Sequence, residues 1–229
     1  MDIAELAEDA WGLCGGASPA GSGHRAAGGA GTAPGRRVLG IAGPPGAGKS
    51  TLARALVAEV NRRHGPDTAG YLPLDGFHLS NAQLERLALT SRKGSAPSFD
   101  VWGYAALLHR VVAEPEREIY VPDYDRALHE PVAARHRVAP GAPLVITEGN
   151  YLGCDTPGWR DARRHLAALW YLEAPDEVRH ERLVARQLAG GRDAGAAAAW
   201  VTDNDHPNGE LVKRSRSRCD RVLAPVRLP

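Results

Sequence analysis

The chain has 229 residues, enough for one α/β domain with a buried core and at most a small lid or appendage. Its 28 Lys and Arg residues nearly balance its 27 Asp and Glu residues, and the formal net charge of +1 gives no field that favours nucleic acid or an anionic membrane. The three cysteines are far apart and form no Cys-x-x-Cys pair, which argues against zinc and redox motifs. No apolar run approaches the roughly 18 residues that span a bilayer, and the acidic start does not resemble a secretory leader, so we expect a cytoplasmic protein.

The first 35 residues are expected to form a flexible extension. Residues 12–35 are dominated by Gly, Ala, Ser and Pro and hold too few large apolar side chains to offset the entropy cost of ordering. Before them, Ile3, Leu6, Ala10 and Leu13 have rough helical spacing, which is compatible with a short helix docked on the main domain. Residues 36–229 are expected to form one catalytic domain.

From residue 37 onward, apolar runs typical of strands alternate with helical patterns. Strands are expected at residues 38–43, 69–75, 118–125, 143–149, 166–174 and 220–226, and helices at residues 50–64, 82–89, 104–113 and 177–189. This alternation predicts an α/β fold with a doubly wound parallel sheet flanked by helices, whose ligands bind at the carboxyl ends of the strands.

A phosphate-binding loop follows the first predicted strand. The motif G-x-x-x-x-G-K-S and the residue after it comprise Gly43, Pro44, Pro45, Gly46, Ala47, Gly48, Lys49, Ser50 and Thr51. Glycines allow consecutive backbone N–H groups to surround phosphates, and the following helix adds its positive end. We expect Lys49 to bridge the β- and γ-phosphates of ATP and the Ser50 hydroxyl to ligate Mg²⁺. A mere Gly/Pro turn is the alternative, but the strand before it and the helix after it favour the P-loop.

A P-loop by itself does not separate a kinase from a GTPase or a motor ATPase. The chain has no Asn-Lys-x-Asp element to read guanine. The segment Asp155–Gly158 imitates a GTPase switch element, but it lies seven residues beyond Glu148 and is interpreted as a turn. A motor ATPase normally has paired acidic residues after a strand such as the one at residues 143–147, and this chain has a single Glu followed by Gly.

Two carboxylates end predicted strands. Asp75 closes the strand at residues 69–75, and Gly76 after it permits a sharp turn. We expect this strand to lie next to the P-loop strand, which places Asp75 near the γ-phosphate as the base that accepts a hydroxyl proton. Glu148 ends the most apolar strand and is expected to hold Mg²⁺ on the side opposite Ser50. The alternatives are a solvent-exposed turn Asp and a Glu that caps the next turn.

The order of the segments GPPGAGKST, LDGFHLS, SFD, YVPDYDRALHEPV, ITEGNYL and an arginine-rich helix resembles the P-loop kinases related to uridine kinase, phosphoribulokinase and bacterial pantothenate kinase. Within this group, the nucleoside/nucleotide kinase-like proteins and proposed sugar kinases look most similar. The resemblance covers about residues 36–228. It implies a P-loop NTPase fold with a small helical lid.

The resemblance also implies an acceptor site. Asp75 matches the catalytic Asp of these kinases, Asp100 matches an F-D element that bonds acceptor hydroxyls, and Tyr124 and His129 match a Tyr and a His that line the acceptor pocket. The substrate-binding set so implied is Asp75, Phe77, His78, Asp100, Tyr124, His129, Asn204 and Asn208. The alternative places Phe99 and Tyr124 in the core and His129 in an exposed loop.

A lid at about residues 179–195 is expected to supply arginines to the transferred phosphoryl group. Arg182 and Arg186 are four residues apart on one helical face, and Arg192 follows a Gly-Gly hinge. Arg186 and Arg192 are favoured as catalytic residues, because a guanidinium there stabilises charge that grows in the transition state. A solvated helix face with Glu177 and Glu181 as partners is the alternative.

The stretch from Asp203 to Arg218 resembles the Asn-containing segment and the Arg-x-Arg of pantothenate-type kinases, although its basic part is also compatible with a plain surface strip. The chain departs from the family in lacking its longer substrate-covering helices and the uridine-kinase hairpin. These departures leave the acceptor open among nucleosides, pantothenate-like acids, sugars and vitamin-like alcohols.

Together the motifs predict an ATP- and Mg²⁺-dependent kinase whose partner is a small molecule with a hydroxyl group, with no nucleic acid or membrane partner. The resemblance allows a homodimer, since relatives often form dimers or tetramers. The rival hypothesis is a regulatory or accessory protein that binds or hydrolyses ATP without a small-molecule acceptor.

Overall fold

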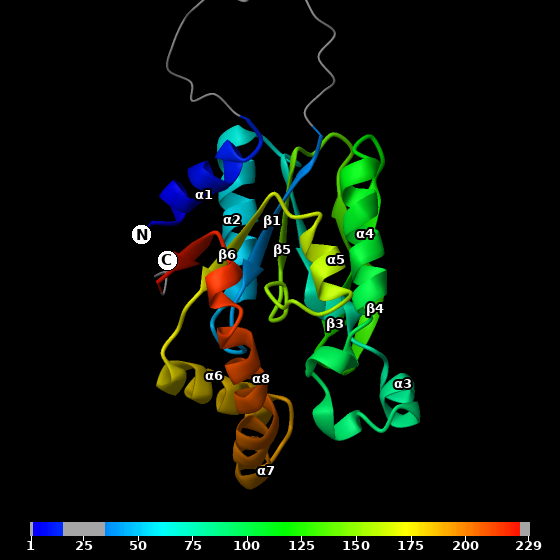
Figure 1. Ribbon diagram of the computed structural model, residues 1–229, viewed down its shortest axis with the longest axis vertical. Coiled ribbons are helices and arrows are strands. Elements are labelled where there is room, and N and C mark those ends of the chain that lie inside the picture. The colour runs from blue at the N-terminus through cyan, green and yellow to red at the C-terminus, as the bar shows by residue number, and fades with distance from the viewer. Residues whose placement is uncertain (1, 16–34, 225–229) are drawn as a thin grey trace, which may run out of the picture.

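The computed structural model describes residues 2–15 and 35–224. A five-stranded sheet forms its centre, with neighbouring strands in the order β2, β5, β1, β6, β7, and all four pairings are parallel. The strands are β1 (Arg37–Ala42), β2 (Ala69–Pro73), β5 (Leu144–Glu148), β6 (Ala168–Leu172) and β7 (Arg221–Leu223). The predicted fold class, a parallel α/β sheet flanked by helices, is confirmed (Figure 1).

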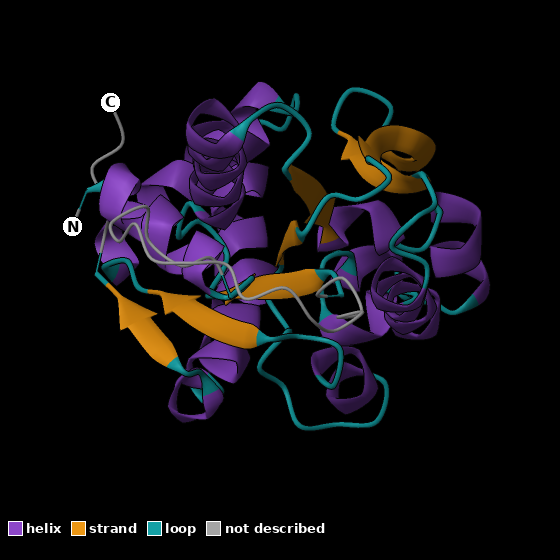
Figure 2. Ribbon diagram, turned by 90° about the horizontal axis from the view of Figure 1, so that it is seen from above, coloured by secondary structure: helices purple, strands orange, loops and turns teal. Residues whose placement is uncertain are grey.

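Helices cover both faces of the sheet because successive strand residues point to opposite sides. On one face, Leu39 and Ile41 of β1 pack with helix α2 (Lys49–His64) and with α1 (Ile3–Gly12). On the other face, Val38 and Ala42 pack with α4 (Val101–Ala113) and α5 (Trp159–Arg163). Figures 1 and 2 show the sheet between these two helical layers, as the doubly wound prediction requires.

The amino-terminal helix α1 is part of the packed body. Asp2 and Glu5 form a capping box at its start, and Leu6, Ala7 and Ala10 are buried in the cluster that contains α2. The helical spacing seen in the sequence therefore corresponds to the face of α1 that packs on the domain. The flexible extension expected at residues 1–35 differs from the structure at residues 3–12, whereas its Gly/Ala-rich part at residues 16–34 lies outside the described residues.

A separate antiparallel hairpin consists of β3 (Ile119–Asp125) and β4 (Glu130–Val138). The sequence predicted the first of these strands but not its place, since β3 pairs only with β4 and does not enter the parallel sheet. The sequence was expected to lack the uridine-kinase hairpin, and the structure has a hairpin at these residues. The strand β4 was missed because its side chains are mainly polar or small and only Val138 is buried, so they give no apolar run.

Four helices gather at the carboxyl end of the sheet (Figure 1). They are α3 (Asn81–Arg86), α6 (Asp176–Ala189), α7 (Ala194–Trp200) and α8 (His206–Lys213), with a π-helical turn at Val201–Asp205 between the last two. The predicted lid at residues 179–195 covers most of α6 and the beginning of α7. The sequence missed α7 because AGAAAAW has no amphipathic period, and Asp193 marks its start as the N-cap.

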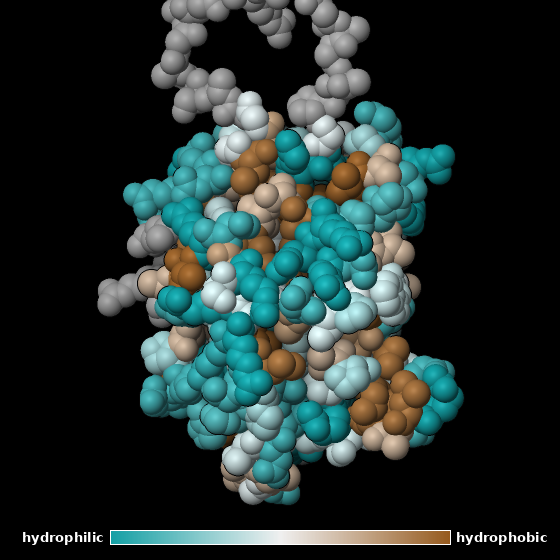
Figure 3. Space-filling view, viewed as in Figure 1, coloured by the Kyte–Doolittle hydropathy of each residue, from teal (hydrophilic) through white to brown (hydrophobic). Residues whose placement is uncertain are grey.

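Hydrophilic side chains cover most of the face shown in Figure 3, with an apolar group at the α3 end of the molecule. Within residues 2–15 and 35–224, no helix combines the length and the apolar character needed to cross a bilayer.

Candidate active site

The P-loop connects β1 to α2 at the carboxyl edge of the sheet. At Gly46 the backbone has φ +80°, and a Cβ there would lie 2.9 Å from the carbonyl oxygen of Arg179, so only glycine fits. Gly48 is the N-cap of α2 and no side chain caps that helix, which leaves its first backbone N–H groups available. A loop of this shape fits a polyphosphate.

Lys49 is buried at the start of α2 and faces the cleft. Its Nζ donates to the Asn150 Oδ1 at 2.7 Å and to the carbonyl oxygen of Pro44 at 3.1 Å. Burial lowers the pKa of Lys49 to about 8, while the charges of Glu148 and Asp75 oppose this effect. Asn150 was missed by sequence reasoning, although its position in the turn two residues beyond Glu148, where β5 ends, is a usable signal.

Glu148 lies at the end of β5 with only 3% of its surface exposed. Tyr71 donates a hydrogen bond to its Oε1 at 2.9 Å, and Ser50 also hydrogen-bonds to it. Burial raises the pKa of Glu148, and the negative charge of Asp75 raises it further. A hydroxyl and a carboxylate held together beside a phosphate loop are oxygen donors of the type that Mg²⁺ prefers, so the residues present fit this ion.

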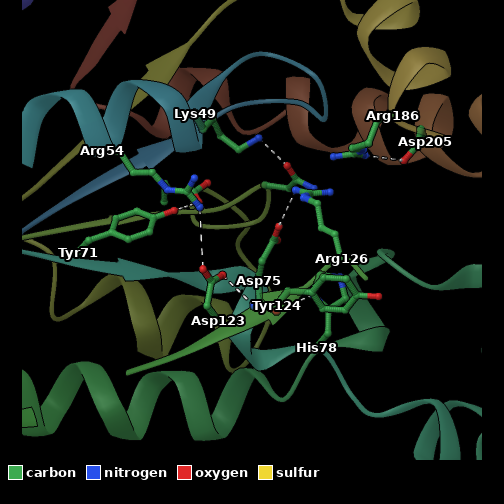
Figure 4. Close-up of polar contacts among 12 residues, drawn as sticks. Lys49, Arg54, Tyr71, Asp75, His78, Asp123, Tyr124, Arg126, Arg186 and Asp205 are labelled. Carbon is green, nitrogen blue, oxygen red and sulfur yellow. Dashed lines mark hydrogen bonds and ion pairs between the residues drawn. The ribbon is translucent and has the colours of Figure 1, made fainter. Parts of the chain in front are cut away.

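Asp75 reaches the cleft by a different route from the one predicted. The strand next to the P-loop strand is β5, and β2 is one position further out. Asp75 lies beyond β2, in a 3₁₀ turn at Leu74–Phe77, and its side chain is 34% exposed. Its charge still acts on both Lys49 and Glu148. The turn, and not a position on the strand next to β1, brings this carboxylate toward the P-loop (Figure 4).

The structure brings His78 and Tyr124 to Asp75. The His78 Nδ1 lies 2.8 Å from the Asp75 carbonyl oxygen, and its ring lies 4.9 Å from that of Tyr124 and 4.1 Å from that of Phe99. Burial lowers the pKa of His78. Tyr124 belongs to β3, so the hairpin forms one wall around Asp75.

Other residues of the predicted acceptor set have structural contacts. The Asp100 carboxylate is the N-cap of α4 and accepts from the Gly103 N–H at 2.9 Å, so its contacts do not support a role in hydroxyl binding. Phe77 packs edge-on against Tyr104 beside the core. His129 is exposed on the hairpin turn with φ +54°, and its backbone carbonyl accepts from Lys93 at 2.6 Å.

Asn204 and Asn208 are buried in the segment that follows α7. The Asn204 Nδ2 donates to the carbonyl oxygen of Lys93 at 2.8 Å, and the Asn208 Nδ2 lies 3.4 Å from the Asn204 Oδ1. These amides thus tie the segment after α7 to the loop that carries Lys93. Their predicted role in acceptor binding stays a prediction.

Arginines of α6 contact the P-loop. The Arg179 Nη1 donates to the Pro45 carbonyl oxygen at 3.1 Å and the Arg182 Nη1 to that of Gly46 at 3.2 Å. Arg186 points into the same space as Lys49 and Asp75, and its Nη2 lies 3.9 Å from the Asp205 Oδ1 (Figure 4). Arg179 was missed as a site residue, although its spacing of three and seven residues from Arg182 and Arg186 places all three on one helical face.

Arg192 does not extend toward the P-loop. Its Nε donates to Gln187 at 3.0 Å, and its guanidinium lies 4.2 Å from the centre of the Trp200 ring. These contacts join the end of α6 to the end of α7, so they do not support the catalytic role predicted for this arginine.

A cavity of about 430 Å³ lies beside the P-loop, away from Asp75. Its lining residues come from the P-loop, from β6 and the residues after it, and from the end of α8 and the turn after it: Pro44, Tyr171, Glu173, Ala174, Pro175, Lys213 and Arg216. Mainly apolar walls with a few polar groups suit a flat heterocycle.

Comparison with known proteins adds relatives that share nearly the whole chain. No family model matches the sequence. A protein of Schizosaccharomyces pombe named "Putative uridine kinase C227.14" is 34% identical over 199 residues, which cover 84% of this chain and 85% of that protein. The chain belongs to the P-loop kinases related to uridine kinase.

Two further matches extend this assignment. The kinase is 36% identical over 190 residues to "Uncharacterized protein YggC" of Escherichia coli, covering 82% of this chain and 77% of that protein. A crystal structure titled "putative fructose transport system kinase" from Silicibacter sp. TM1040 superposes with a TM-score of 0.80 at 33% identity, covering 97% of this chain and 99% of the other. The protein is therefore a small-molecule kinase, as predicted.

Proposed function

We propose that this kinase transfers the γ-phosphoryl group of ATP to a hydroxyl of a nucleoside, a pantothenate-like acid or a sugar. The observation that carries the proposal is that Lys49 on the P-loop and Asp75 on the turn after β2 point into the same space, close enough for the Asp75 charge to act on Lys49. The names of two relatives, a uridine kinase and a fructose transport system kinase, favour nucleoside and sugar alcohols as acceptors.

The roles of the residues follow from their places. The P-loop amides and Lys49 hold the phosphates of ATP, and the 430 Å³ cavity receives its adenine ring. Ser50 and Glu148 would hold Mg²⁺, which would supply positive charge against the phosphates. Arg186 supplies a further positive charge near the transferred group.

Asp75 is the proposed base. As the acceptor oxygen forms its bond to the γ-phosphorus, the bond from that phosphorus to the β–γ bridging oxygen breaks and ADP leaves. The hydroxyl proton passes to the Asp75 carboxylate. At 34% exposure the side chain is accessible to an incoming alcohol, and His78 and Tyr124 form the wall beside it.

Replacement of Asp75 by Asn tests the assignment. Asp75→Asn should lower kcat by about 10²- to 10⁴-fold, because the amide accepts no proton, and should leave ATP affinity nearly unchanged. Coupled ADP detection against a panel of hydroxyl compounds, with mass spectrometry of the product, measures the first effect, and calorimetry with ATP measures the second.

The matched control is Asp67→Asn. Asp67 lies at an exposed turn with φ +59°, a conformation that Asn tolerates, and pairs with Arg137 on the surface. This variant should retain full turnover. ADP release that is equally fast with and without every acceptor would contradict the kinase reaction proposed here.

A further inference from the structure

A second positive charge lies close to Asp75 on the hairpin. Arg126 stands on the turn between β3 and β4, and its Nη2 is 3.8 Å from the Asp75 Oδ2. This separation is too long for a hydrogen bond, and within residues 2–15 and 35–224 no other ion pair of this guanidinium is found. Its side chain is 58% exposed. Arg126 thus presents a guanidinium to the cleft with its hydrogen-bond donors free.

Arg186 approaches the same space from α6. Its own ion pair, with Asp205, is also long at 3.9 Å. Burial lowers the pKa of Arg186, and the charge of Asp205 raises it. The positive charge of Arg126 also lowers this pKa, so the guanidiniums of Arg126 and Arg186 are close enough to repel each other. Both charges also act on Tyr124, whose pKa burial raises to about 12. An anion bound by Arg126 would relieve this repulsion and leave Arg186 to the transferred phosphoryl group.

The cations that contact the P-loop are residues other than Arg126. Lys49 lies on the P-loop, and Arg179 and Arg182 contact the loop from α6. Arg126 belongs to the hairpin and reaches Asp75 from the side of His78 and Tyr124 (Figure 4). A guanidinium at that place faces the acceptor, and guanidinium forks bind carboxylates and phosphate esters in two-point contacts.

We propose that the acceptor carries, besides its hydroxyl, an anionic group, either a carboxylate or a phosphate ester, that binds Arg126 on the hairpin turn. This inference rests on the proposed function and narrows it. A neutral nucleoside or sugar offers no ion-pair partner to Arg126. A phosphorylated or oxidised counterpart offers a phosphate ester or a carboxylate that pairs with the guanidinium.

The experiment compares acceptors in matched pairs: ribose 5-phosphate with ribose, gluconate with glucose, and pantothenate with pantothenyl alcohol. Binding is measured by calorimetry on the full chain with Mg²⁺ and a non-hydrolysable ATP analogue, and turnover by coupled ADP release. At least one anionic member should bind about 10- to 100-fold more tightly than its neutral counterpart. The first pair reports on a phosphate ester and the other two on a carboxylate.

Arg126→Gln should remove this preference while the KM for ATP stays the same. Arg135→Gln is the matched control, since Arg135 lies on the same hairpin, is half-exposed and pairs with Asp125 at 3.2 Å. It should keep the preference. Equal binding of the two members of every pair, or a rise in the KM for ATP in Arg126→Gln with an equal loss for neutral and anionic acceptors, would overturn the inference.

The binding measurement separates this inference from the proposed function. Preferential binding of an anion that depends on Arg126 supports the inference even if no member of the panel is phosphorylated. Turnover of neutral acceptors alone would support phosphoryl transfer and refute the anionic group.

Discussion

Lys49 carries its charge inside the protein with only 7% of its surface exposed. Its amine is held by Asn150 and by the carbonyl of Pro44, and neither of these partners is a full negative charge. Desolvation therefore outweighs the attraction of the two nearby carboxylates, and the pKa falls to about 8. The residue proposed to bridge two phosphates is thus close to losing its proton under mildly alkaline conditions.

The first prediction concerns the pH profile. Below pH 8 the Lys49 amine is charged and binds phosphate, and above it the amine becomes neutral, so kcat/KM for ATP should fall as pH rises through about 8. In Lys49→Arg the guanidinium keeps its charge, so this fall should disappear whatever the remaining activity. Initial rates from pH 6 to 10 measure both profiles. A flat wild-type profile between pH 7 and 10 would show that Lys49 stays charged.

At the scale of elements, the turn after β2 is held against the hairpin by a close backbone contact. A Cβ on Gly76 would collide with the main chain of Pro122 in β3. The sequence suggested that Gly76 permits a sharp turn. The structure gives a different reason, since Gly76 is absent from the positive-φ residues and its small size allows two elements to touch.

Gly76→Ala should therefore destabilise the protein by about 1–3 kcal/mol and lower kcat, because the Cβ pushes Asp75 and the hairpin apart. Denaturant unfolding and ADP release measure the two effects. Gly12→Ala is the matched control, since a Cβ there meets nothing within 4 Å and alanine favours a helix. Retention of wild-type stability by Gly76→Ala would show that the two elements separate without cost.

On the scale of the whole molecule, one buried side chain joins several distant segments. Arg36, 3% exposed just before β1, donates only to backbone carbonyls. The acceptors come from the end of α4, the loop after it and the connection from β4 to β5: Val111, Glu114, Pro115, Arg117, Ala139 and Ala142. Burial lowers the pKa of Arg36. The hydrogen bonds offset the cost of placing this cation inside the protein.

Arg36→Met should lower the free energy of unfolding by about 3–5 kcal/mol, because it leaves buried carbonyls without donors. Its neighbour Arg37 is exposed on β1, and Arg37→Met should change stability by less than about 0.5 kcal/mol. Urea unfolding followed by circular dichroism compares the two variants. Equal midpoints would mean that water replaces the Arg36 guanidinium without loss.

The sequence by itself determined the features that depend on short spacing. The P-loop, the strand before it and the helix after it need only glycines, an apolar run and a helical period within about 30 residues, so they were predicted correctly. The docking of α1 also has a local signal, since Leu6 and Ala10 lie on one helical face. Membership of the kinase family followed from the order of such local motifs.

Only the tertiary structure decided which residues meet. The strand order places β5, and not β2, beside the P-loop strand, and an apolar run does not specify its neighbour in a sheet. Asn150 contacts Lys49, Arg179 contacts Pro45 and Arg126 contacts Asp75, each across a long stretch of chain. Asp100 caps a helix, whereas the motif around it implied that it binds the acceptor. These contacts depend on how whole helices and strands pack together, and the spacing of residues along the chain does not specify that packing.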